Sequence, residues 1–144
     1  MNKNLPDKWI RKAIYDRINN MVVDSNTIPC YDYRVTGSNV PAHYILVTTQ
    51  SSEVDKRNKC EYSWESSVLL DIVTTYKSSG NTGSRLLADN ILDSARALID
   101  GLTLDANSGL KIVTEKQGFP SDIATITKNQ NVFRKFLRLE LLID

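Results

Sequence analysis

The sequence VFRKFLRLELLI, at residues 132–143, decides the fold of this chain. Its residues alternate between two sets, and the first set is almost entirely apolar. The first set is Phe133, Lys135, Leu137, Leu139, Leu141 and Ile143, and the second is Arg134, Phe136, Arg138, Glu140 and Leu142. Alternation with a period of two predicts a long strand of an antiparallel sheet, with one face on a core and the other partly in water.

The second set of this strand is also informative, because Phe136 and Leu142 stand among its charged residues. Apolar side chains on the outer face of a strand are typical of a surface that another molecule covers. We therefore expect this outer face to contact another subunit.

Length and composition indicate one domain, residues 1–144. A chain of 144 residues with 41% hydrophobic residues can bury a core without disulfides or metal. The 18 Lys and Arg residues and 17 Asp and Glu residues nearly cancel, so the net charge predicts no general attraction to nucleic acid or anionic lipid. The first residues resemble neither a signal peptide nor a membrane span, and we expect the protein to begin in the cytosol, without membrane contact.

Two helices are predicted from apolar residues at steps of three and four. The first covers about residues 5–21, with Asn4 as a cap, and the second covers about residues 84–100, with Thr82 or Ser84 as a cap and Gly101 at its end.

Strands are predicted around these helices, and their order defines the fold class. They cover residues 43–49, 62–76, 110–115, 122–127 and 132–143, and residues 31–35 are extended. Too few helices separate the strands for parallel crossovers, so we expect an α+β two-layer sandwich, a mainly antiparallel sheet packed against two helices. One residue set is expected to be buried in its core: Trp9, Ile14, Leu46, Leu70, Ile91, Leu98 and Leu139.

No motif for catalysis stands out. His43 is the only histidine, and Cys30 and Cys60 are too few for a disulfide framework or a zinc site, so both are expected to be reduced. We predict no catalytic residues, no cofactor-binding residues and no metal site. Two carboxylate pairs, Glu61 with Glu65 and Asp89 with Asp93, have a spacing that acid–base or metal sites share with solvated surfaces.

The order of segments resembles the tail-terminator proteins of tailed bacteriophages, also called tail-completion or head-tail joining proteins. The likeness covers an amphipathic first helix, PCYDYRV at residues 29–35, VPAHYILV at 40–47, LADNI at 87–91 and the last strand. Ala42 and His43 depart from the family pattern, in which the proline more often precedes the aromatic residue directly.

This resemblance implies a structural protein of the virion, with no enzymatic activity. Proteins of that family form a homo-oligomeric ring at the head-tail, neck or tail-terminus region, where it joins or caps the tube and leaves a channel for DNA. The implied partners are other copies of the chain, in a hexamer or a larger ring such as a dodecamer, the neighbouring portal, connector or tail-tube proteins, and genomic DNA without sequence-specific binding. Assembly would take place in the host cytoplasm.

A polar stretch at residues 50–59, expected to be a solvated loop or hairpin tip, completes the predicted subunit interface. Its Glu53, Asp55, Lys56, Arg57 and Lys59 can complement each other head to tail around a ring, beside Phe136 and Leu142. Two alternatives keep the fold: a monomeric ligand-binding domain or small enzyme, and a phage protein that binds a host partner.

Overall fold

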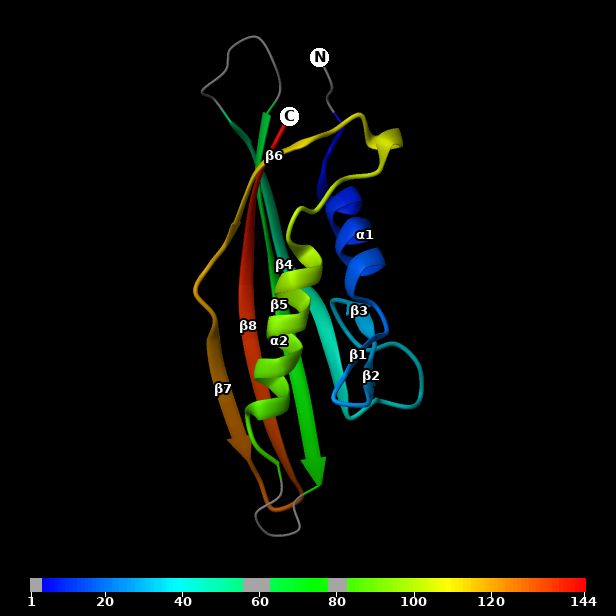
Figure 1. Cartoon of the computed structure of the whole chain (residues 1–144), viewed down its shortest axis with the longest axis vertical. Coiled ribbons are helices and arrows are strands. Elements are labelled where there is room, and N and C mark those ends of the chain that lie inside the picture. Colours follow the sequence, from blue (N-terminus) through cyan, green and yellow to red (C-terminus); the bar gives the residue numbers. More distant parts are fainter. Residues whose placement is uncertain (1–3, 56–62, 78–82) are drawn as a thin grey trace.

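Helices α1 (Asp7–Ile18) and α2 (Leu86–Ile99) lie side by side across one face of a long, twisted sheet (Figure 1). The computed structural model describes residues 4–55, 63–77 and 83–144. Helix α1 packs on the side of the sheet that holds β3 and β4, and α2 packs over β5 and β8. The protein is therefore an α+β sandwich of two layers, which confirms the fold predicted from the sequence.

The sheet has six strands in the order β3-β4-β5-β8-β6, and β7 pairs with the same edge of β8 as β6. Its strands are β3 (Cys30–Asp32), β4 (His43–Asp55), β5 (Ser63–Lys77), β6 (Ile112–Gln117), β7 (Ser121–Ile126) and β8 (Gln130–Ile143). All pairs are antiparallel except the pair of β3 and β4. A separate hairpin of β1 (Met21–Val23) and β2 (Asn26–Ile28) follows α1.

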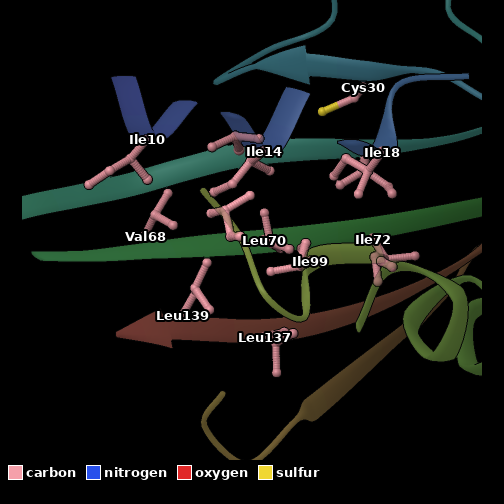
Figure 2. Close-up of a cluster of buried hydrophobic side chains, with 14 of the residues drawn as sticks. Ile10, Ile14, Ile18, Cys30, Val68, Leu70, Ile72, Ile99, Leu137 and Leu139 are labelled. Atoms are coloured by element: carbon pink, nitrogen blue, oxygen red, sulfur yellow. The ribbon is translucent and has the colours of Figure 1, made fainter. Parts of the chain in front are cut away.

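The core lies between the helices and one face of the sheet. In β5 and β8, the register places Leu70 opposite Leu137 and Val68 opposite Leu139, and all four side chains are buried. Figure 2 shows isoleucines from both helices meeting this row of side chains. The helix residues that are fully buried are Ile10, Ile14 and Ile18 of α1 and Ile91 and Ile99 of α2. Removal of this apolar surface from water is the main stabilising contribution to the sandwich.

Two residues of the predicted core are more exposed than expected. Leu98 is 39% exposed, because the buried stripe of α2 passes through Ala95 and Ile99 and leaves Leu98 on its flank. Trp9 is only partly buried, at the border of the core. The other five are buried: Ile14, Leu70, Ile91 and Leu139 lie in this core, whereas Leu46 lies on the opposite face of the sheet.

The predicted ends of the first helix were wrong. Asn4 does not cap it, since its side-chain amide donates to the Ser108 carbonyl and Pro6 occupies the N-cap position. The helix ends at Ile18 rather than near residue 21, because Asn20 has a left-handed backbone (φ 60°) and Met21 begins β1.

The second helix begins at Leu86. The Ser84 hydroxyl accepts a hydrogen bond from the Leu86 N–H (3.3 Å), although Arg85 occupies the cap position. The other predicted cap, Thr82, lies outside the described residues. Gly101 follows the helix with a positive φ of 71°, as predicted for a residue that ends a helix.

Residues 50–59 were predicted to be a solvated loop or a hairpin tip, but the first six belong to a strand, because β4 continues to Asp55 and pairs with β5. This polar segment remains in the sheet because its side chains find polar partners. The hydroxyls of Ser51 and Ser67 lie 3.0 Å apart, and the Gln50 amide donates to the Asp7 carbonyl of α1 (2.9 Å). Residues 56–59 lie outside the described part of the chain.

Truncation of Leu70 tests the position of the core. Leu70→Ala should lower the free energy of unfolding by about 2–5 kcal/mol, because it leaves a cavity between the sheet and the helices. Leu98→Ala removes the same atoms from a partly exposed site and should lower it by about 1 kcal/mol or less. Urea denaturation monitored by circular dichroism measures both values, and equal losses would contradict the assigned core.

Candidate assembly surface

The face of the sheet turned away from both helices carries an apolar band, and we call this surface the open face. Alternation along each strand sends every second side chain to it. Its large apolar members are Tyr31, Tyr44, Leu46, Leu69, Val73, Ile123, Val132, Phe136 and Leu142. Among the described residues, α1 and α2 contact the opposite face. The open face is thus a second apolar surface on a sheet whose first apolar surface is already covered.

The centre of the open face is densely packed. Leu46 and Val73 are 9% and 1% exposed even though they face away from the helices, and Phe136 is half-buried in the row of Leu46. The rings of Tyr31 and Tyr44 meet edge to face at 6.2 Å on the β3 side. Neighbouring side chains therefore hold the aromatic groups in place, which lowers the entropy that a partner's binding would remove.

A buried carboxylate lies within this band. Asp71 of β5 sits between Leu46 and Phe136 and is 5% exposed. Its Oδ2 lies 3.3 Å from the guanidinium of Arg134, and its Oδ1 is buried without a hydrogen-bond partner. Burial raises the pKa of Asp71 above its ordinary value of 3.8, and the charge of Arg134 opposes that rise. A charged group is thus fixed at the centre of an apolar surface.

The two ends of the open face differ in charge. One end forms a hollow of about 500 Å³, and among the described residues its lining includes Glu53, Glu65 and Glu140, with Lys116 as the one cation. The other end forms a hollow of about 780 Å³ lined in part by Lys77, Lys128 and Arg134. Glu53 and Glu65 stand directly opposite each other on β4 and β5. The long strands therefore join an acidic end to a basic end.

The residues predicted for the interface fall into three groups. Phe136 and Leu142 lie half-buried on the open face, and Glu53 lies on the same face at the acidic end. Asp55 is the last residue of β4 and pairs with Ser63. The remaining three residues, Lys56, Arg57 and Lys59, are outside the described part of the chain.

Sequence reasoning missed the ion pair of Asp71 and Arg134. A signal was present, because an aspartate interrupts the apolar run VLLDIV at residues 68–73. A carboxylate in the middle of a central strand is rare unless a partner compensates its charge.

The single histidine and the described cysteine occupy structural positions. His43 lies against Tyr76, with ring centroids 5.3 Å apart, and burial lowers its pKa. Cys30 is buried in the core, and burial, followed by the charge of Asp32, raises the pKa of its thiol to about 12. The Cys30 thiol is therefore protonated and unreactive at neutral pH. Cys60 lies outside the described residues.

The candidate carboxylate pairs separate in the structure. Asp89 forms an ion pair with Lys135 of β8, whereas Asp93 is exposed on α2. Glu65 belongs to the acidic end of the open face, and Glu61 lies outside the described residues. Within residues 4–55, 63–77 and 83–144, no group of three or more His, Cys, Asp or Glu side chains is placed to hold a metal ion. The helices in these same ranges are all too short or too polar to span a membrane.

Comparisons with known proteins find similarity in fold alone. No protein-family model matches the sequence, and no curated protein matches it. A chain in a solved structure of the virion of a native gene transfer agent particle has a similar fold, with a TM-score of 0.58. The alignment covers 94% of this chain and 96% of that chain at 10% sequence identity. The likeness therefore extends over the whole sandwich.

The ion pair on the open face predicts a pH-dependent stability. A carboxyl whose pKa is raised in the folded state binds more protons folded than unfolded, so its contribution to stability falls as the pH rises above 3.8. Asp71→Asn removes this loss of stability at higher pH. The free energy of unfolding of the variant, relative to that of the wild type, should therefore increase as the pH rises from about 4 to about 7.

Arg134→Met should have the opposite pH dependence. It leaves the buried carboxylate without its cation, which should lower the free energy of unfolding by about 1–3 kcal/mol near neutral pH and by less in acid. Urea denaturation across this pH range measures both variants. Parallel stability curves for Asp71→Asn and the wild type would contradict the assigned burial of this charge.

Proposed function

We propose that this protein is a structural component of a phage-like virion and assembles with copies of itself into a ring at the head-tail, neck or tail-terminus region. The observation that carries the proposal is the open face, an ordered apolar band on a sheet whose other face is already filled. The fold shared with a chain of a gene transfer agent virion and the sequence resemblance to tail-terminator proteins both point to the same class.

The open face has the composition of a protein interface. Interfaces combine an apolar centre rich in aromatic residues and arginine with a polar rim. The centre here holds Phe136, Tyr44 and Arg134, and Leu142 extends it toward the acidic end. These groups would supply affinity, because their burial removes apolar surface from water.

The charge difference between the two ends of the open face would fix the direction of assembly. When the acidic hollow of one copy faces the basic hollow of the next, side chains of opposite charge meet, which favours this orientation. A contact between two different surfaces is heterologous, and such contacts close into rings when the rotation permits. Of the charged residues predicted for the interface, Glu53 lies at the acidic end.

The ring would hold six copies, or a larger number such as twelve, and would join or cap a tube while leaving a channel for genomic DNA. Its neighbours would be portal, connector or tail-tube proteins. In this role the protein is not an enzyme and needs no cofactor. A monomer of 16.2 kDa at all concentrations would favour the alternative, a ligand-binding domain or small enzyme.

Phe136→Asp tests the assembly surface. It places a charge at the centre of the apolar band, so no ring should form at any salt concentration, while each subunit remains folded. Sedimentation velocity and negative-stain imaging measure the assembly, and circular dichroism verifies the fold.

Val22→Asp serves as the matched control. Val22 is 69% exposed on β1, outside the six-stranded sheet, and receives the same charge. Rings should form normally with this variant. Rings of unchanged size and stability with Phe136→Asp would show that the subunits associate through another surface.

A further inference from the structure

Strand β7 forms an edge of the sheet with one charged residue, Asp122, and no bulge. It lies along the outer side of β8 (Figure 1), and in the described part of the chain β8 is its only partner. All residues from Ser121 to Ile126 are exposed, with Ile123 at 56% and Ile126 at 71%. An exposed apolar edge with free backbone groups is a template for pairing with another strand.

The edges at β3 and β6 are protected. At β3, the outward N–H of Cys30 donates to the side chain of Asn19 (3.0 Å), and the Asp32 carbonyl accepts from the Arg34 N–H (2.7 Å). Strand β6 carries a bulge between Ile112 and Thr114 as well as charged side chains. Bulges and charges are the devices that prevent edge pairing. Of the edges at β3, β6 and β7, the edge at β7 therefore offers the backbone groups best suited to pairing with a new strand.

The register of β7 identifies which backbone groups face outward. Thr127 donates to the Gln130 carbonyl (3.0 Å) at the turn, so residues 121, 123, 125 and 127 direct their N–H and C=O groups toward β8. The groups of Asp122, Ala124 and Ile126 consequently point away from the sheet.

We propose that β7 pairs antiparallel with β7 of a second copy of this chain, about a two-fold axis at Ala124. In this register, Ala124 faces its own counterpart, and Asp122 of each copy faces Ile126 of the other. The outward groups of the three residues then match one another as hydrogen-bonded pairs across the axis. The pairing joins two six-stranded sheets into one.

The side chains suit this register. Ala124, which would lie on the axis, is small enough to let the backbones approach. Asp122 is the only charged residue of β7, and its two copies would lie about 13 Å apart along the strands, so like charges do not meet. Asp122 is also already compensated within its own copy by Arg85 (3.0 Å).

The pairing is also continuous with the open face. Ile123 projects to that face beside Arg134, and the two Ile123 side chains become diagonal neighbours across the axis. The apolar band would then extend from one copy to the other. A two-fold contact ends at a pair of subunits, so it would join two rings, or pair free subunits, without enlarging a ring.

Charge variants at Ala124 test the register directly, in the Phe136→Asp background, which removes the face contact proposed above. Phe136→Asp alone should be dimeric by sedimentation equilibrium. Adding Ala124→Lys or Ala124→Glu places like charges opposite each other and should weaken dimerisation by roughly tenfold or more. An equimolar mixture of the two should restore it, because opposite charges then face each other.

Three outcomes of this experiment would contradict the β7 pairing. A monomeric Phe136→Asp protein, dimers unaffected by either charge, or failure of the mixture to restore them would overturn the β7 pairing. Val22→Lys and Val22→Glu provide the control and should not change dimerisation. The proposed ring is tested separately, because it predicts rings in the protein with native Phe136 whether or not β7 pairs.

Discussion

The pairing of β5 with β8 is the constraint on which the rest of the structure depends. The two strands run antiparallel in unbroken register from the pair of Trp64 and Ile143 to the pair of Lys77 and Gln130. Because side chains alternate between faces, a slip of one residue would move Leu137 and its neighbours from the core to the open face. The helices, the neighbouring strands and the open face all take their positions from this register.

One consequence of this register is that the same strand serves two surfaces. In β8, Leu137 and Leu139 fill the core, whereas Phe136 and Leu142 belong to the open face. The buried Asp71 adds a requirement for Arg134, since a buried charge without a partner is strongly unfavourable. The residues proposed for the interface are thus held by the packing that stabilises the monomer.

Much of the fold could be predicted from the sequence because apolar alternation and helical spacing are local signals. The strand at residues 132–143 and the outward position of Phe136 followed from alternation alone. The prediction of a loop at residues 50–59 failed because polar residues of this segment form hydrogen bonds with hydroxyls of the neighbouring strand and with α1. Only the folded chain brings these groups together. The hairpin of β1 and β2 was missed because its strands have three residues each and the turn rests on the positive φ of Asp24 and Ser25.

The candidate surface could be predicted only in part. Phe136 and Leu142 are recognisable within one strand, but the row that joins Leu46, Asp71 and Phe136 comes from three strands far apart in the sequence. The charge difference between the ends of the open face likewise depends on register. The free groups of β7 depend on which of its edges β8 occupies, and sequence patterns carry no information on that choice.

The central claim is that the open face becomes buried when copies of the chain assemble. The most direct measurement is the maleimide labelling rate of Ser67→Cys, on the open face, and of Val22→Cys, on β1, in a Cys60→Ser background, with the mass followed in parallel. With increasing protein concentration, the mass should rise, the labelling of Ser67→Cys should slow strongly and the labelling of Val22→Cys should stay constant. A mass that remains at 16.2 kDa, or assembly that leaves Ser67→Cys as reactive as before, would contradict the account.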